Sequence, residues 1–229
     1  MRGVRKRGRR ANGQWQRKGR RRTVPLRRGR RATIGELKFH DVGFSDAVIA
    51  ATGAIIEDSV LTIAQGTTES TRIGRKVRVK SINWRFTLQL PTTATPAETA
   101  DSIRIILYLD KQANGATATV TGILETAAFN AYRNLANTGR FVILMDRFYA
   151  LNSQSGAGNP VGEQGINFGI HRKELSFNKT CDIPIEYDNS FTTGVISTMR
   201  SNNIGVLGIT QAGLAGMTTS NMRIRFSDQ

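Results

Sequence analysis

The sequence predicts an all-β protein, a two-sheet antiparallel sandwich that follows a basic N-terminal arm and carries a small helical insertion. Polar and apolar residues alternate with a period of two in most segments after residue 36, as in strands with one buried face. Only one segment has helical periodicity, which leaves too few helices to cover a parallel sheet. With 229 residues, 39% of them hydrophobic, the chain can bury one sizeable core or two small ones.

The first 31 residues carry most of the net charge of the chain. They hold 15 of the 33 Lys and Arg residues and no acidic residue, so residues 32–229 are left with 18 basic and 17 acidic residues. Such a segment has too few apolar residues to offset the entropy of ordering. We therefore expect a disordered arm at 1–31 and a folded domain at 32–229.

We expect this arm to bind nucleic acid without reading its sequence, and with strong sensitivity to salt. Arginine predominates in it, and the guanidinium group suits contacts with phosphate. A solvated tail, or a nuclear import signal alone, is the alternative for such a charge run. The cations of the arm that we assign to nucleic-acid binding are Arg2, Arg5, Lys6, Arg7, Arg9, Arg10, Arg17, Lys18, Arg20, Arg21, Arg22, Arg27, Arg28, Arg30 and Arg31.

The segment 75–90 shows a clear strand pattern whose phase changes once. Val77 and Val79 are apolar at odd positions, whereas Ile82 and Trp84 continue the apolar pattern at even positions. A one-residue slip in a period of two indicates a β-bulge or a strand that changes partner sheets. Further segments with strand character, which suggest about eight strands in all, are 102–110, 140–149, 171–178, 182–188, 204–210 and 221–226.

A turn, a helix and a long loop are expected between these strands. The Asn-Gly pair within DKQANG (110–115) is a strong turn signal. Apolar residues recur at i, i+4, i+7 and i+11 from Leu124 onward, which predicts an inserted helix over 122–136. The Gly-, Ser- and Asn-rich segment 152–169 predicts a long exposed loop.

The set of chemically reactive residues argues against an enzyme. The two histidines, His40 and His171, are far apart, and no P-loop, zinc-binding or nucleophile motif occurs. Cys181, the single cysteine, is expected to be a small buried apolar residue rather than a nucleophile. The segment 110–115 resembles the start of a calcium loop, but Thr121 stands where such a loop needs glutamate. We therefore expect no catalytic residue, no metal ion and no cofactor.

Three carboxylates provide the one catalytic alternative. Asp182, Glu186 and Asp188 would share one face of a strand, as a nuclease that uses a divalent metal ion would require. Surface carboxylates at the edge of a sandwich are the interpretation that we prefer. No apolar run approaches the ~18 residues of a membrane span, and we expect neither membrane insertion nor a secretory signal.

The segment 61–82, LTIAQGTTESTRIGRKVRVKSI, resembles the capsid proteins of small circular single-stranded DNA viruses that encode a replication protein, the circovirus-like group. Members of this group often carry I-x-Q-G followed by R-I-G-R-K-(V/I)-x-V-K-S-I. Three further segments fit in the same order: LYLDKQANG (107–115), RFVILMDR (140–147) and RIRFSD (223–228).

This resemblance implies a single jelly roll of eight strands in two sheets. It also implies that the chain assembles with itself into the smallest icosahedral shell, the T=1 shell of sixty subunits, around circular single-stranded DNA. The arm would face the interior, and host nuclear import receptors would act before assembly. The chain would then occur in the virion and in the host nucleus, with a host attachment factor that the sequence does not identify.

A second basic cluster lies within the body, next to the family motif. We expect Arg72, Arg75 and Lys76 to face the lumen of the shell and to contact DNA. The alternative is that Arg75, together with Arg78 and Lys80, only solvates a strand edge and deters stray strand pairing. For the whole chain, the main alternative is a cellular nucleic-acid-binding protein with a basic tail on a β-sandwich body.

Overall fold

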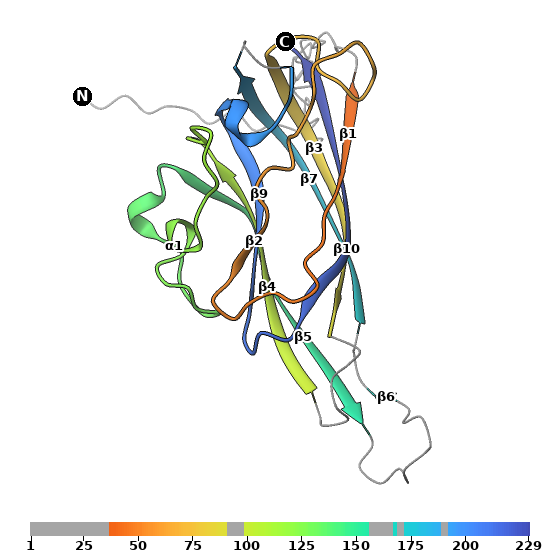
Figure 1. Cartoon of the computed structure of the whole chain (residues 1–229), viewed down its shortest axis with the longest axis vertical. Helices are drawn as coiled ribbons and strands as arrows, with labels where there is room; N and C mark the ends of the chain where they lie inside the picture. Colours follow the sequence, from red (N-terminus) through yellow and green to blue (C-terminus); the bar gives the residue numbers. More distant parts are fainter. Residues whose placement is uncertain (1–36, 91–98, 156–166, 169–171, 189–191) are drawn as a thin grey trace, which may run out of the picture. The chain divides into compact units, whose positions relative to one another are not determined.

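Two antiparallel β-sheets pack face to face in the protein, as Figure 1 shows. The computed structural model describes residues 37–90, 99–155, 167–168, 172–188 and 192–229. Within these residues the first sheet has the strand order β1 (Lys38–Gly43), β10 (Gly216–Asp228), β3 (Lys76–Gln89), β7 (Arg172–Tyr187) and β8 (Met199–Ser201). The second sheet has the order β2 (Ala54–Glu57), β9 (Asn203–Thr210), β4 (Thr99–Asp110), β5 (Phe141–Ser155) and β6 (Asn167–Phe168).

The strand order is that of a jelly roll. β1 pairs with β10, β2 with β9, β3 with β7 and β4 with β5, so each pair nests within the one before it. Eight strands wrapped in this way form the two four-stranded sheets of a jelly roll. β6 and β8, of two and three residues, only extend the sheet edges. The predicted fold of eight antiparallel strands is therefore confirmed.

One large apolar core lies between the two sheets. Trp84 on β3 is fully buried there, and its ring stacks on Phe86 with 4.2 Å between the ring centroids. The Nε1 of Trp84 donates a hydrogen bond to the Oγ of Ser220 on β10, at 2.6 Å, which satisfies the polar end of the indole. Ile105 and Leu107 of β4 contribute to the same core from the second sheet. The inward faces of β3 and β4 are those that the alternation predicts.

The change of phase in β3 is a β-bulge at Lys80. β10 passes from Arg225 to Phe226 while β3 passes from Ser81 to Val79, so Lys80 has no partner in β10. The register with β7 shifts at the same place. The bulge directs apolar residues on both of its sides into the core, because it reverses which positions face inward. The sequence allowed either a β-bulge or a change of partner sheet, and the structure has the bulge.

The connection between β4 and β5 holds the small helical insertion, but the helix predicted over 122–136 is wrong. The structure has one turn of α-helix, α1 (Val120–Ile123), and one 3-10 turn, Leu135–Asn137. The insertion packs on the second sheet over a small apolar cluster that includes Tyr108 and Leu207 (Figure 1). Because apolar residues of this sheet are buried on both of its faces, its strands contain nearly continuous apolar runs.

Tertiary contacts explain why the insertion is not a longer helix. Arg104 on β4 is buried and donates two hydrogen bonds to the carboxylate of Asp146, at 2.8 and 2.7 Å. Its Nη1 also donates to the carbonyl oxygens of Phe129 and Ala131, at 3.1 and 2.7 Å. These contacts hold the backbone of the insertion in a non-helical path, and a four-residue apolar pattern is too weak to compete with them.

Two other predictions are refined by the structure. The strands expected at 171–178 and 182–188 form one continuous strand, β7. The turn expected at 110–115 is present, and Asn114 and Gly115 adopt φ angles of 44° and 70°, which suit an Asn-Gly pair.

Part of the predicted organisation lies outside the described residues. The arm at 1–31 lies wholly outside them, as does most of the loop expected at 152–169. At the ends of that loop, β5 continues to Ser155 and β6 occupies residues 167–168. No helix in the described part of the chain is long and apolar enough to cross a membrane.

Candidate nucleic-acid interface

The residues assigned to nucleic-acid binding fall into two groups. The fifteen cations of the arm lie outside the described residues, so their role stays a prediction. The second group, Arg72, Arg75 and Lys76, lies at the start of β3 and in the loop before it. The structure separates the members of this second group.

Arg72 is a buried structural residue. Only 1% of it is exposed, and its guanidinium carbon lies 4.4 Å from the ring centroid of Tyr187. Its Nε donates to the carbonyl oxygen of Ile63 at 3.1 Å, and its Nη1 donates to that of Gly74 at 2.7 Å. Burial lowers the pKa of the guanidinium group, while the carbonyl groups and the aromatic ring stabilise its charge. This position contradicts the expectation that Arg72 contacts DNA.

Replacing Arg72 by lysine is expected to destabilise the fold without weakening DNA binding. The lysine keeps the charge but cannot reproduce the forked hydrogen bonds, so the free energy of unfolding should fall by about 2 kcal/mol. Urea denaturation measures this loss, and fluorescence anisotropy with an oligodeoxythymidine measures binding. The matched control is Arg75→Lys at an exposed site. Weaker DNA binding by Arg72→Lys at unchanged stability would contradict the structural role.

Arg75 and Lys76 are exposed and share one carboxylate. Glu186 on β7 has its carboxylate oxygens 3.7 Å from the Nε of Arg75 and 3.9 Å from the Nζ of Lys76. The two basic side chains are 44% and 48% exposed, so these pairs contribute little to stability. Both cations are accessible to solvent, and their assignment to DNA binding stays a prediction.

Asp182 lies between two further cations of β3. Its carboxylate is bound by Arg78, and the Nζ of Lys80 lies 2.7 Å from its Oδ1. The hydrogen bond from Lys80 and the charges of both cations hold the pKa of Asp182 below its ordinary value. The four cations at 75–80 thus face two carboxylates of β7, and half of their charge is balanced within the sheet.

The carboxylates that raised the alternative of a nuclease are ion-pair partners. Asp182 and Glu186 each contact two cations, and Asp188 lies 3.5 Å from the Nη2 of Arg200. In the described ranges, no three His, Cys, Asp or Glu side chains lie close enough together to hold a metal ion. Asp182 and Glu186 lie on β7 and Asp188 follows its last residue, and their partners are cations of the protein rather than a shared metal ion.

Other residues considered for chemistry also have structural settings. Asp110 is buried and accepts hydrogen bonds from Arg140 at 2.9 and 2.7 Å, so it is not an open calcium ligand. Cys181 is half-buried, and burial raises the pKa of its thiol, which keeps the less reactive protonated form near neutral pH. Burial lowers the pKa of His40, whereas His171 lies outside the described residues.

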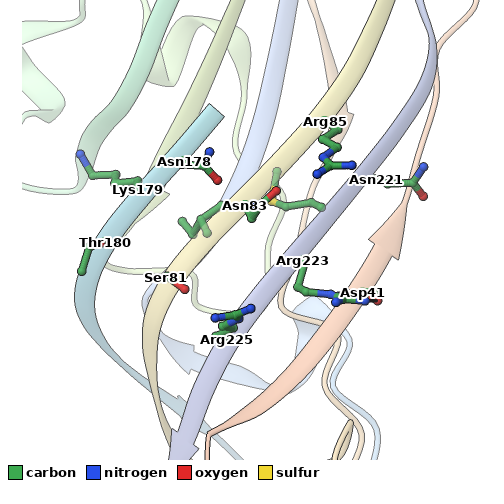
Figure 2. A pocket seen from close by; sticks show the side chains of 12 residues that line it. Asp41, Ser81, Asn83, Arg85, Asn178, Lys179, Thr180, Asn221, Arg223 and Arg225 are labelled. Atoms are coloured by element: carbon green, nitrogen blue, oxygen red, sulfur yellow. Dashed lines mark hydrogen bonds and ion pairs between the residues drawn. The ribbon is translucent and has the colours of Figure 1, made fainter. Parts of the chain in front are cut away.

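A polar groove crosses the outer face of the first sheet, over β1, β10, β3 and β7 (Figure 2). Its volume is about 780 Å³, and amide, hydroxyl and guanidinium groups dominate its lining. Strand alternation creates this lining, because the residues between those of the groove fill the core. We call this feature the first-sheet groove.

Three cross-strand rows each place one arginine in the first-sheet groove. In each row an arginine faces a neutral polar side chain on the paired strand. The pairs between β10 and β3 are Arg225 with Ser81, Arg223 with Asn83, and Asn221 with Arg85. Successive rows of a strand face are about 6.7 Å apart. The groove therefore holds three cations at regular spacing among neutral groups.

One of these three arginines is neutralised within the protein. The Nε and Nη2 of Arg223 donate to the carboxylate of Asp41, at 2.7 and 2.6 Å, and these bonds lower the pKa of Asp41. Arg85 and Arg225 are exposed and have no hydrogen-bond or ion-pair partner among the described residues. Lys179, at the border of the groove, points away from them in Figure 2. The groove thus has a surplus of positive charge.

Sequence reasoning did not assign this groove to nucleic acid. Alternation identifies Arg85, Arg223 and Arg225 as outward residues of their strands. Residue 85 and residues 223–225 are far apart in the sequence, however, and only the pairing of β3 with β10 brings them together. No local sequence signal marks that pairing.

The chain matches a known protein family. The family model named satellite tobacco necrosis virus coat protein matches residues 16–229. Among solved structures, the chain is similar to Desmodium yellow mottle tymovirus, with a TM-score of 0.35, 11% identity, and coverage of 85% of this chain and 88% of that chain. It is also similar to the 60-mer BFDV capsid protein, with a TM-score of 0.30, 9% identity, and coverage of 84% and 91%. No curated protein sequence matches the chain.

The family match spans nearly the whole chain, whereas the structural likenesses are too weak to carry an argument. The matched range includes every strand of the jelly roll and about half of the basic arm. It confirms that the chain is a capsid protein, and that its role is structural rather than enzymatic. The chain belongs to the satellite tobacco necrosis virus coat protein family and is therefore a component of a virus particle.

Proposed function

We propose that this coat protein forms the smallest icosahedral shell and packages circular single-stranded DNA through the basic arm at 1–31. The observation that carries the proposal is the division of charge along the chain. Fifteen cations and no acid lie in the arm, whereas residues 32–229 have 18 basic and 17 acidic residues. A nearly neutral body can pack against copies of itself, while the arm supplies the attraction for phosphate.

The total charge of the arms is suited to a small genome. A shell of sixty subunits, each with fifteen arm cations, would place about 900 positive charges inside. This charge could balance a large part of a strand of about 1–2 kilobases, with other cations supplying the rest. The resemblance to the circovirus-like group supports circular single-stranded DNA as the packaged form.

The arm also has the composition of a nuclear import signal. Clusters such as Arg20–Arg22 and Arg27–Arg28 are typical of segments that import receptors bind. Import through the arm would bring the subunit to the host nucleus before assembly, and packaging would then cover the signal with DNA. The two uses of the arm are successive and do not compete.

Electron microscopy and light scattering test this proposal on the full chain and on a variant that lacks residues 1–31. We expect the full chain to form uniform round particles that protect nucleic acid from nuclease. The truncated chain should contain little protected nucleic acid, because the arm cations are gone. Digestion of the extracted material with DNase or RNase identifies its type.

Three outcomes would count against the proposal. A full chain that stays monomeric under all assembly conditions would contradict the shell. Equal nucleic-acid content in full and truncated particles would contradict packaging by the arm. Protected material that consists of RNA alone would contradict single-stranded DNA as the cargo.

A further inference from the structure

We propose that the first-sheet groove binds the sugar-phosphate backbone of single-stranded nucleic acid, with Arg85 and Arg225 as its phosphate ligands. This inference rests on the proposed function, because it adds a contact on the body to the packaging by the arm. It assigns a binding role to residues outside the two basic clusters that the sequence singles out. Four observations support it: the spacing, the unpaired charge, the neutral groups of the lining and the connection to the arm.

The spacing of the groove fits a polyanion. Arg225, Arg223 and Arg85 belong to three successive rows across β10 and β3, and neighbouring rows are about 6.7 Å apart. This interval is comparable to the distance between successive phosphates of an extended single strand. A strand that follows the groove can therefore present one phosphate to each row in turn.

The charge of the groove is not satisfied by the protein itself. Asp41 is the one carboxylate in its lining, and Arg223 already binds both oxygens of that group. Arg85 and Arg225 are exposed, and neither makes a hydrogen bond or an ion pair with a described residue. Cations that crowd together on one sheet face repel one another, and a bound phosphate chain would relieve that repulsion.

The neutral groups of the lining complement this charge. Asn83, Asn178 and Asn221 carry amide groups, and Ser81 and Thr180 carry hydroxyl groups, all without a net charge. Such groups can donate to phosphate and sugar oxygens, which most protein–DNA hydrogen bonds use. None of the twelve residues that line the groove is an aromatic platform for bases, so we expect contact with the backbone and no preference for a base sequence.

The basic arm directly precedes, in the sequence, the strand that borders the groove. β1 is the edge strand of the first sheet, its Asp41 lines the groove, and the basic segment 1–31 precedes β1 in the chain by only a few residues. A strand held by the arm is thereby kept at a high effective concentration near the groove. This connection favours nucleic acid over a polyanion outside the particle as the occupant.

The test measures the salt dependence of oligodeoxythymidine binding by full-chain subunits that carry Arg85→Gln and Arg225→Gln together. Loss of two phosphate contacts should make the log–log salt slope shallower by about 1.4 and weaken binding about tenfold near physiological salt. The matched control is Lys111→Gln with Arg147→Gln, which removes the same charge from exposed positions near and on the second sheet. Its slope should stay close to that of the unchanged protein.

A second variant separates charge from misfolding. Arg85→Lys with Arg225→Lys keeps both charges, so it should retain most of the salt slope of the unchanged protein. A slope for the glutamine pair that equals that of the control pair would overturn the groove while leaving packaging by the arm intact. A full chain that binds no oligonucleotide at all would overturn both proposals.

Heparin serves as the probe for the competing occupant, a sulfated polysaccharide. We expect the glutamine pair to lose oligodeoxythymidine affinity in the same proportion as heparin affinity, since both probes present regularly spaced anions. If the variant lost heparin binding alone and kept the full oligonucleotide slope, the groove would be a glycan surface and the inference would be wrong.

Discussion

Raising the salt concentration from about 50 to about 200 mM is expected to weaken the binding of single-stranded DNA to the full chain by a factor of about 10⁴ to 10⁵. The arm has fifteen cations, and neutralisation of phosphates by about ten of them corresponds to a log–log salt slope of about −7 to −9. The physical cause is the release of counterions that the DNA holds before binding. Fluorescence anisotropy with labelled oligodeoxythymidine, at subunit concentrations below those of assembly, measures the slope.

A graded change of the arm provides the control for this prediction. Replacing Arg20, Arg21 and Arg22 by glutamine removes three charges and should make the slope shallower by about 2. Replacing the same residues by lysine keeps the charge and should leave the slope nearly unchanged. A slope near zero in the full chain, or one that the glutamine variant does not alter, would show that the arm is not the main contact with DNA.

The substitution Trp84→Ala is expected to lower the free energy of unfolding of the jelly roll by about 3 to 5 kcal/mol. Trp84 is fully buried between the sheets, its ring stacks on Phe86, and its ring centroid lies 5.9 Å from that of Phe44. Alanine would leave a large cavity and would also leave the Oγ of Ser220 without its donor. Because folded domains are stable by only about 5–15 kcal/mol, this loss removes a large part of the total.

Urea denaturation of unassembled subunits measures this effect. The variant Trp84→Phe keeps most of the apolar volume and should lose clearly less stability than Trp84→Ala. The neighbouring residue Asn83 faces the solvent, so Asn83→Ala should change the free energy of unfolding by less than about 0.5 kcal/mol. A loss below about 1 kcal/mol for Trp84→Ala would mean that the core does not depend on this ring.

The features that sequence reasoning predicted well are those with a period of two. In β3, the change from apolar odd positions at Val79 to apolar even positions at Ile82 indicated a bulge or a change of partner sheet, and the structure has a bulge at Lys80. In a strand with one buried face, the apolar positions of the period-two pattern identify the side chains that point inward. The same argument identified the core faces of β4 and β10.

The period-two pattern did not predict which polar residues are buried. Arg72 and Arg104 are nearly fully buried, although their type suggests surface residues. The same holds for Asp101, whose carboxylate accepts hydrogen bonds from four backbone N–H groups, three of them in the connection between β9 and β10. Each of these residues is buried because a partner distant in the chain satisfies its polar atoms, and the sequence does not record such partners.

Two properties of the protein were therefore determined by the sequence alone: the separation of a basic arm from a charge-balanced body, and the alternation that makes the body a β-sandwich. Both depend only on the order of residues in the chain, because this order fixes the charge of a segment and the alternating direction of side chains along a strand. The positions of charged groups in space were decided by the tertiary structure. Pairing of β3 with β10 joins Arg85 to Arg223 and Arg225 in one groove, while the loop before β3 buries Arg72. Strand pairing depends on the packing of the whole core, so no segment of the chain specifies it by itself.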